Sequence, residues 1–425
     1  MRILYLLFNQ QDSVTEFSNN PKISLSWVDA LLDELVKCEN LNIALAVPIN
    51  NNTIQKSQKK GITVFGLPNP AEKNILKKAY NRVTGTSREI NINSYIPEVV
   101  DDFNPDIIQI FGSENPFGLI VKDIKTPVVI HIQGYLFVWQ RKWFSGITAW
   151  EQFRYARLKD LFLMRSNYNA FHSFRKKAAT EAVIVENCKY FMGRTDFDRR
   201  IAALVSPGSK YFHCEEFIRK DFFEKRWNYP LHNEVVCVSI IKGTSYKGID
   251  LLIECFMILK KYSTLSFKFK ICGISGNEEI TRIVRKKYKN GCDFKDIEFL
   301  GKLSADDLVN QLCNSNIYVH PSYIENSPNS VCEAMALGMP VVATNVGGVS
   351  ALLEDEEEGI LVQEGEPYSL AGAIVDLIND YEKANQMGSN ARIKALSRHD
   401  PEKIMDSLLK IYDNIIYEDG RKSLS

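Results

Sequence analysis

The sequence predicts an α/β protein with two Rossmann-like, doubly wound domains that face each other across a cleft. Its 425 residues exceed what one hydrophobic core usually organises. In both halves, short and nearly continuous apolar runs alternate with segments of helical periodicity. No run approaches the roughly 20 apolar residues that a membrane-spanning helix needs. A pair of parallel sheets covered by helices is the architecture that fits all three observations.

The expected strands are short runs rich in β-branched residues, as in strands covered on both faces. The expected strands of the first half begin at Ile3, Asn42, Ile62, Asp106 and Val128. Those of the second half begin at Glu234, Ser266, Ile297, Asn316, Pro340 and Gly359. Residues 27–35 carry an apolar stripe at helical spacing. Strands that alternate with helices in this way predict parallel sheets.

The domain boundaries follow from the same pattern. We expect a first domain over residues 1–225, a second over 226–400, and a last amphipathic helix over 401–425 that packs back toward the first domain. Residues 222–233 contain Pro230 and have no clear period, so they are the best linker candidate.

The composition excludes several classes of protein. Lys and Arg together number 52, and Asp and Glu together also number 52. The chain therefore has no net positive charge that would favour binding to nucleic acid. The nine cysteines are scattered without a Cys-x-x-Cys pair, which indicates reduced thiols and neither a disulfide framework nor a zinc site. The N-terminus has too short an apolar core for a signal peptide and is interpreted as a first strand. We therefore expect a cytoplasmic protein.

The most informative stretch is SYIENSPNSVCEAMALGMPVVATNVGG, residues 322–348. It predicts a loop, a helix and a strand, with Ser327 as the N-cap, Pro328 as the first helical residue and Gly338 at the helix end. The N–H groups near Asn329 and Ser330 then open the helix. Together with the partial positive charge of the helix end, they favour a bound phosphate.

Two carboxylates flank this turn. Glu325 precedes the helix and Glu333 lies more than one turn inside it. Each carboxylate can accept hydroxyl groups, so a diphosphate between two polyol rings, as in a nucleotide sugar, would fit. The alternative stays open that Glu325 is a solvated loop residue and Glu333 a charge on a helix surface.

A second motif, VCVSIIKGTSYKGIDLLI, begins at Val236 and predicts a strand, a polar loop and a helix. Lys242 and Lys247 bracket the loop. Two ammonium groups at the carboxyl end of a strand can neutralise a diphosphate and stabilise it as a leaving group. Alternatively, both lysines are surface residues of an ordinary loop.

With its two glutamates, the segment EAMALGMPVVAT and the pair Gly347-Gly348, the sequence resembles the retaining glycosyltransferases of group 4, which have the GT-B fold. The resemblance implies that the first domain binds the acceptor and the second the nucleotide-sugar donor. It implies that Glu325 contacts hydroxyls of the donor sugar, Glu333 contacts the ribose, and the N–H groups of Asn329 and Ser330 hold the diphosphate.

Other family features are matched less closely. By resemblance, His131 at a strand end reaches the donor sugar. The family usually has an arginine where this chain has Lys242, and lysine supplies charge without a bidentate fork. The glycine-rich loop after the first strand is replaced by a polar stretch, residues 8–24, which either approaches the ligand differently or serves the acceptor.

The expected function is transfer of a sugar, with retained configuration, from a UDP- or GDP-linked donor to a glycan or lipid-linked acceptor in surface polysaccharide or glycolipid synthesis. No metal-ligand cluster is evident, so catalysis without a metal or other cofactor is expected. Two alternatives remain: a sugar-nucleotide epimerase or hydrolase, and a non-catalytic sugar-nucleotide-binding protein. A dehydrogenase is disfavoured because no Gly-x-Gly-x-x-Gly follows either first strand.

Residues 140–180 hold nine Lys or Arg against two acidic residues, and nine aromatic residues. This composition fits a peripheral contact with an anionic membrane, or a groove for a lipid diphosphate. A core helix with a solvated basic face explains it equally well.

Overall fold

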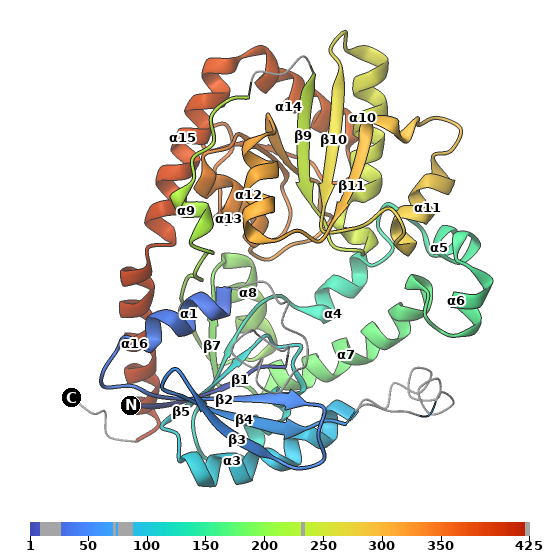
Figure 1. The fold of residues 1–425 in the computed structure, drawn as a ribbon. Helices are drawn as coiled ribbons and strands as arrows, with labels where there is room; N and C mark the ends of the chain where they lie inside the picture. Colours follow the sequence, from blue (N-terminus) through green and yellow to red (C-terminus); the bar gives the residue numbers. More distant parts are fainter. Residues whose placement is uncertain (9–26, 71–73, 75–87, 231–233, 421–425) are drawn as a thin grey trace. The chain divides into compact units, whose positions relative to one another are not determined.

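The protein is described here by a computed structural model covering residues 1–8, 27–70, 74, 88–230 and 234–420. Its contacts divide the chain into two compact units. Unit 1 comprises Met1–Val138, His172–Phe217 and His399–Ser425, and unit 2 comprises Trp139–Phe171 and Ile218–Arg398. Figure 1 shows the elements of both units. Each unit is built around its own sheet and is described separately.

Unit 1 contains an eight-stranded sheet with the order β3-β4-β2-β1-β5-β6-β7-β8. Neighbouring strands are parallel except for β3 and β4, which pair antiparallel at one edge. The strands are β1 Arg2–Leu6, β2 Asn42–Ile49, β3 Gln55–Lys59, β4 Ile62–Pro68, β5 Ile107–Phe111, β6 Val128–His131, β7 Tyr190–Gly193 and β8 Lys210–His213.

Helices cover both faces of this sheet, because alternate strand residues point to opposite sides. Ile3 and Tyr5 of β1 join one buried cluster with helices α1 and α16, while Leu4 and Leu6 join another with α3, α7 and α8. The helices of unit 1 are α1 Trp27–Leu35, α3 Ile96–Phe103, α7 Asn167–Asn187, α8 Asp196–Val205 and α16 Pro401–Glu418, with α7 beginning in unit 2.

Unit 2 contains a six-stranded, fully parallel sheet with the order β11-β10-β9-β12-β13-β14. The strands are β9 Val235–Ile240, β10 Phe267–Cys272, β11 Ile297–Gly301, β12 Ile317–His320, β13 Val341–Thr344 and β14 Ile360–Val362. The chain leaves β9 toward β10 on one side and returns to β12 on the other, so the direction of winding reverses between β9 and β12.

The two faces of the second sheet are also covered. Cys237 of β9 packs with α10, α11 and α14, while Val238 packs with α9, α12 and α13. The helices of unit 2 are α5 Ala149–Tyr155, α6 Leu158–Phe162, α9 Asp221–Glu224, α10 Ile249–Tyr262, α11 Glu279–Lys287, α12 Ala305–Cys313, α13 Asn329–Leu337, α14 Pro367–Asn379 and α15 Tyr381–Arg398. Helix α4, Leu136–Trp139, lies at the boundary of the units.

Short 3-10 segments complete the structure. They are η2 Arg88–Tyr95, η3 Pro116–Lys122, η4 Gln140–Lys142, η5 Ser245–Lys247, η6 Phe294–Asp296 and η7 Val349–Ala351.

The predicted fold class, α/β with two parallel sheets, is confirmed, and each of the eleven expected runs forms a strand. How the two domains face each other stays a prediction. Strands β3, β7 and β8 were not expected from the sequence. The polar loop predicted after the first strand lies almost entirely outside the described residues.

Two local predictions need correction. Helix α13 begins at Asn329 with Pro328 as the N-cap, so the predicted cap at Ser327 is wrong by one residue; no side chain caps this end. The linker predicted over residues 222–233 contains helix α9 and the buried Phe222 and Trp227, which belong to the core of unit 2.

The compact units also differ from the expected domain limits. Residues 139–171 group with unit 2, and the chain enters unit 2 again at Ile218, before the expected boundary at 225. The residues from His399 onward group with unit 1.

Candidate functional site

The candidate site of unit 2 lies where the winding of its sheet reverses. Strands β9 and β12 are parallel neighbours, so the loops that follow them emerge at the same edge of the sheet. In open α/β sheets, ligands bind at the carboxyl ends of the strands at such a reversal. The loop after β9 carries Lys247, and the loop after β12 carries Glu325.

Two glycines allow these loops to approach closely. Gly248 has a φ of 75°, and a Cβ there would lie 2.0 Å from the carbonyl oxygen of Pro321. Gly347 has a φ of 55°, and a Cβ there would lie 1.8 Å from the carbonyl oxygen of Glu325. Both positions therefore require glycine, for backbone conformation and for space.

Lys247 and Glu325 form a buried ion pair. The ammonium nitrogen of Lys247 lies 2.6 Å from Oε1 of Glu325. The hydroxyl of Ser322 donates to the same oxygen at 2.8 Å, and Nε2 of His320 lies 3.3 Å from it. All recorded contacts of this carboxylate use Oε1, so Oε2 remains for another donor.

The surroundings of Glu325 keep it ionised. Its burial acts to raise its pKa, but the charge of Lys247 and the contact with His320 outweigh that effect, so the pKa lies well below the usual range. The site therefore contains a fixed negative charge next to a fixed positive one.

Glu333 is paired with a residue that the sequence did not single out. Nε and Nη2 of Arg219 donate to Oε1 of Glu333 at 2.9 and 2.6 Å. Burial raises the pKa of Glu333, and Arg219 reverses only part of that shift. Arg219 lies 114 positions from Glu333 in the sequence, and the sequence alone does not predict that the two side chains pair.

The remaining predicted residues of unit 2 lie around this edge. Asn329 and Ser330 are the first residues of α13, where N–H groups precede the regular helical hydrogen bonds. Lys242 is exposed in the loop after β9. The structure thus brings Lys247 and Glu325 into contact and places Asn329 and Ser330 close along the chain, while Glu333 pairs with Arg219 instead.

A pocket of about 500 Å³ adjoins the Glu325 loop. It is formed by residues that follow β12, β13 and β14, and by Lys142 from the segment inserted into unit 2. Lys142 forms an ion pair of 2.5 Å with Glu364 at this pocket. The lining residues are Lys142, Tyr323, Ile324, Asn345, Val346, Gly347, Leu361, Val362, Gln363 and Glu364.

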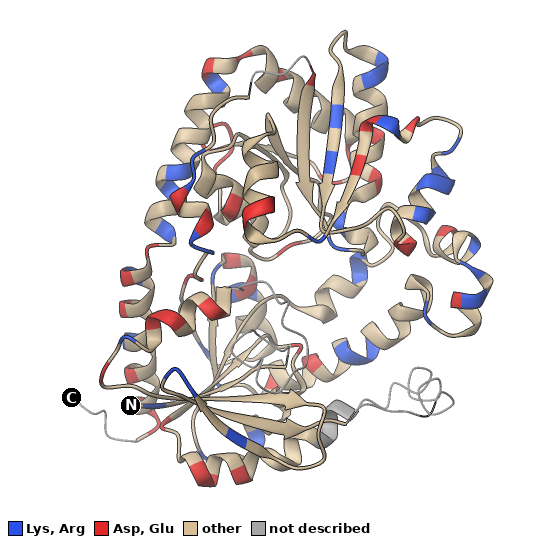
Figure 2. Cartoon of the chain, viewed as in Figure 1, with Lys and Arg blue, Asp and Glu red and all other residues tan. Residues whose placement is uncertain are grey.

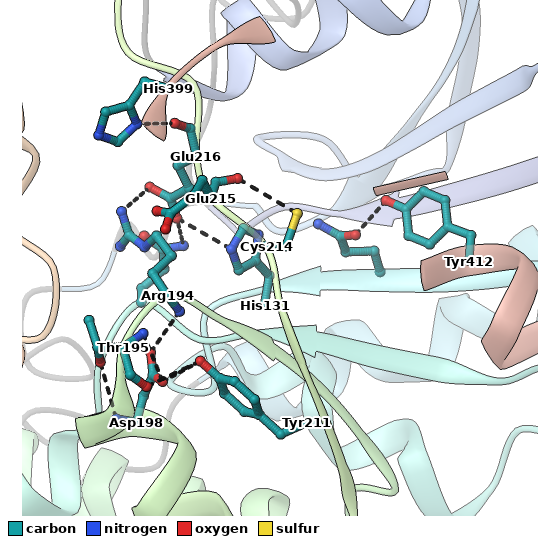
Figure 3. A network of polar contacts seen from close by, with 12 residues as sticks. His131, Arg194, Thr195, Asp198, Tyr211, Cys214, Glu215, Glu216, His399 and Tyr412 are labelled. Atoms are coloured by element: carbon teal, nitrogen blue, oxygen red, sulfur yellow. Dashed lines mark hydrogen bonds and ion pairs between the residues drawn. The ribbon is translucent and has the colours of Figure 1, made fainter. Parts of the chain in front are cut away.

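Unit 1 contains a separate polar cluster around His131, shown in Figure 3. Glu216 lies at its centre and is almost fully buried. Its carboxylate forms an ion pair of 2.7 Å with Arg194, accepts a hydrogen bond from Gln133, and lies 3.6 Å from Nε2 of His131. Its backbone oxygen contacts Nδ1 of His399 at 2.7 Å.

This cluster keeps the imidazole of His131 neutral. Burial and the charge of Arg194 lower the pKa of His131 to about 3. Neither ring nitrogen makes a hydrogen bond to the described residues, and both nitrogens are buried. No role was predicted for Glu216, because its contacts form only in the folded chain.

Among the described residues, no group of three or more His, Cys, Asp or Glu side chains is arranged to hold a metal ion. In the same ranges, every helix is too short or too polar to cross a bilayer.

Solved structures share the fold of this chain. Sucrose-phosphate synthase from Thermosynechococcus elongatus superposes with a TM-score of 0.68 over 98% of this chain and 99% of its own, at 15% identity. Anabaena HepE, solved in complex with UDP and glucose, superposes with a TM-score of 0.66 over 97% of this chain and 100% of its own, at 14% identity. The chain therefore has the GT-B fold predicted by the resemblance.

A match to a sequence family covers a shorter part of the chain than the structural superpositions do. Residues 221–394 match the family described as "Glycosyl transferases group 1", so the chain carries a glycosyltransferase domain of that group. This domain contains Lys242, Lys247, Glu325 and Glu333.

Curated relatives agree with this assignment. The capsular polysaccharide biosynthesis glycosyltransferase CapM of Staphylococcus aureus is 25% identical over 53% of this chain and 58% of its own. A second relative is the Campylobacter jejuni enzyme N,N'-diacetylbacillosaminyl-diphospho-undecaprenol alpha-1,3-N-acetylgalactosaminyltransferase. It is 25% identical over 60% of this chain and 65% of its own. The chain spans about half the length of the first curated relatives it matches, at 45%, 58% and 41%.

Proposed function

We propose that the protein is a retaining glycosyltransferase of group 4 that transfers a sugar from a UDP- or GDP-linked donor to a hydroxyl acceptor. The observation that carries the proposal is the Lys247–Glu325 pair beside the start of α13, within a group 1 glycosyltransferase domain. A cation, an acidic hydrogen-bond acceptor and a helix N-terminus then lie at one edge of the sheet. These are the groups needed to hold a sugar diphosphate.

The chemistry assigned to these residues is mainly electrostatic. The ammonium of Lys247, with Lys242 in the same loop, stabilises the negative charge that develops on the departing diphosphate. The N–H groups of Asn329 and Ser330 hold the phosphate oxygens. The free oxygen of Glu325 accepts a hydroxyl of the donor sugar, and that of Glu333 accepts a ribose hydroxyl. The proposed step forms the bond to the acceptor oxygen as the bond to the diphosphate breaks.

Retention follows if the acceptor attacks from the face that the diphosphate leaves, with a donor phosphate oxygen taking the acceptor proton. In unit 1, the neutral His131 would donate or accept a hydrogen bond at the donor sugar. We propose that no metal is required, because Lys247 and Lys242 already supply positive charge at the leaving group.

The acceptor is proposed to be a glycan or a lipid-linked sugar in surface polysaccharide or glycolipid synthesis. The names of the relatives from Staphylococcus aureus and Campylobacter jejuni support this class, since one refers to capsular polysaccharide and the other to a diphospho-undecaprenol acceptor. Neither name fixes the sugar that this chain transfers.

A donor panel tests the proposal. The protein is heated with each of several UDP- and GDP-linked sugars, in excess EDTA and then with added Mg²⁺. A ligand that binds only the folded state at a hundred times its Kd stabilises by about 2.7 kcal/mol, which is a clear thermal shift. We expect one donor to raise the Tm in EDTA. A shift that appears only with metal would contradict metal independence, and no shift with any donor would contradict the proposed function.

Product analysis with the identified donor separates the enzymatic alternatives. Transfer that requires an added acceptor supports the glycosyltransferase. Epimerised or hydrolysed donor formed at the same rate without acceptor would support the epimerase or hydrolase. Binding with no product at all would indicate a sugar-nucleotide-binding protein.

We also propose that the surface of α5 and α6 contacts an anionic membrane. Leu158 and Phe162 are 84% and 87% exposed, and Trp150 is 64% exposed. The basic Arg154, Arg157, Lys159 and Arg165 are exposed between or beside them, and Figure 2 shows basic residues on α6 and α11.

The acidic residues of this surface are already paired, Glu151 with Lys287 and Asp160 with Arg282. Its remaining charge is therefore positive, which together with apolar side chains suits an anionic lipid surface. The nine free cysteines suit a reducing compartment, so we propose the cytoplasmic face.

Sedimentation with phosphatidylglycerol-containing vesicles tests this contact. The double variant Leu158→Ser with Phe162→Ser should bind at least about tenfold more weakly than wild type, since two apolar side chains are lost from the interface. Leu204→Ser, at a residue of α8 that is 79% exposed, is the control and should bind normally. Equal binding by all three proteins would contradict the proposed surface.

A further inference from the structure

We propose that Arg219 is a positioning residue that holds Glu333 in the orientation and ionised form needed to accept the ribose hydroxyls of the donor nucleotide. This inference rests on the proposed function, since it assumes a nucleotide at α13. Arg219 belongs to unit 2, as does Glu333, so the pair is formed within one compact unit. Arg219 precedes the segment that matches the glycosyltransferase family, residues 221–394.

The contact geometry leaves half of the carboxylate for a ligand. Both donating nitrogens of Arg219, Nε and Nη2, bond to Oε1 of Glu333. No contact to Oε2 is recorded among the described residues, and Oε2 is not one of their buried, unpaired atoms. A common parallel bidentate pair would occupy both oxygens. The observed pair fixes the carboxylate plane through one oxygen and leaves the other accessible.

The guanidinium is itself held in place. Its central carbon lies 4.7 Å from the ring centroid of Phe222, and Phe222 is fully buried in the core of unit 2. Stacking of this kind immobilises an arginine and compensates part of its lost hydration. Arg219 therefore presents a fixed fork to Glu333.

Glu333 needs this partner because it is buried at 7% exposure. A buried carboxylate without a compensating charge takes up a proton. The titratable groups recorded around it are Arg219, Asp221 and Tyr318, and Arg219 is the only cation among them. Loss of Arg219 would leave burial and the repulsion by Asp221 to favour the neutral acid, which is a weaker acceptor of hydroxyl groups.

The same arrangement recurs at the neighbouring carboxylate. Lys247, Ser322 and His320 all contact Oε1 of Glu325, and Oε2 again lacks a recorded partner. Two carboxylates on one loop and helix thus each present one oxygen to a ligand. This repetition is what a site for two sets of hydroxyls requires.

Calorimetric titration with UDP and GDP tests the role of Arg219 at about pH 6 and about pH 8, a range in which an ordinary glutamate stays ionised. With the nucleotide that wild type binds, Arg219→Gln should weaken affinity about tenfold at the higher pH, the loss expected for a charge-assisted hydrogen bond. The loss should be larger at the lower pH. Arg219→Lys should show the same pH dependence as wild type, with an intermediate affinity.

Lys220→Gln is the matched control, since Lys220 is the next residue along the chain and its side chain is 86% exposed. It should bind like wild type. Glu333→Gln should weaken binding and abolish the extra pH dependence of Arg219→Gln when the two are combined. This combination separates an effect through Glu333 from general damage to the fold, which thermal unfolding of each variant measures directly.

Two outcomes would overturn the inference. If the Arg219→Gln variant binds the nucleotide as tightly as wild type, Arg219 is dispensable. If the variant binds more tightly, Arg219 occludes the site. An affinity loss that does not depend on pH and persists in Glu333→Gln would mean that Arg219 acts elsewhere. If wild type binds neither UDP nor GDP, the proposed function itself fails, and that result is distinct from both.

Discussion

The two glutamates of the candidate site show how similar burial leads to different chemistry. Glu325 and Glu333 are 4% and 7% exposed, and each is bound through Oε1 by a basic side chain. Their pKa values nevertheless shift in opposite directions, downward for Glu325 and upward for Glu333. Glu325 has Ser322 and His320 in addition to its cation, whereas Glu333 has Arg219 alone.

Burial acts to raise both pKa values, and the neighbouring charges outweigh it at Glu325 but not at Glu333. Glu325 lies in the loop beside Lys247 and stays ionised. Glu333 lies inside a helix and depends on one partner. Its charge is therefore the more easily perturbed of the two.

The largest expected difference is kinetic. Glu325→Gln should lower turnover at least about a hundredfold, because it removes the proposed contact with the donor sugar and leaves Lys247 without its counter-ion. It should change the affinity for UDP or GDP by less than about threefold, since neither nucleotide contains the sugar that is transferred. Glu333→Gln should do the reverse and mainly weaken nucleotide affinity. Steady-state kinetics and calorimetry on both variants check this, and similar profiles would remove the distinction between the two carboxylates.

A smaller effect should follow from displacing the Glu325 loop alone. Gly347→Ala places a Cβ 1.8 Å from the carbonyl oxygen of Glu325 at a φ of 55°. The clash and the unfavourable conformation should cost about 2–4 kcal/mol in the free energy of unfolding. Gly276→Ala, where a Cβ would meet nothing within 4 Å, is the control for denaturant titrations. A Gly347→Ala variant as stable as this control would show that the loop adapts easily.

The smallest effect concerns the acid dependence of stability. The pKa of Glu325 is lower in the folded state, so its ionised form stabilises the fold above the ordinary glutamate pKa of 4.5, and this contribution is lost as the pH falls below that value. The stability difference between wild type and Glu325→Gln should shrink by about 1–2 kcal/mol on acidification. Urea titrations at several pH values measure it. Glu186→Gln, at an exposed residue of α7, should show no such trend; a constant difference for Glu325→Gln would contradict its permanent charge.

Much of the fold could be predicted from the sequence because buried parallel strands leave a strong local signal. Runs such as those of β2 and β9 are continuous and apolar, as strands covered on both faces must be. Strand β3, QKSQK, is polar and pairs antiparallel at an edge, so neither apolarity nor alternation marks it. Strands β7 and β8 have only four residues each, too few for a clear pattern.

The candidate site was predictable where its residues belong to one continuous segment. Glu325, Asn329, Ser330 and Glu333 share a loop and helix whose signals are local. Arg219 and Glu216 were missed because their partners, Glu333 and His131, lie 114 and 85 positions away along the chain. Lys142 was likewise seen only as one member of a basic segment, although it lines the pocket with Glu364.

The interleaving of the two units has a practical consequence for fragments and chimaeras. The chain passes between them four times, after Val138, Phe171, Phe217 and Arg398. A single cut, such as one near residue 225, would strip residues 139–171 from the half that they help to build and leave the hydrophobic face of α16 without its sheet. Exchanging the glycosyltransferase domain with that of a relative would therefore require both of its pieces to be transplanted together.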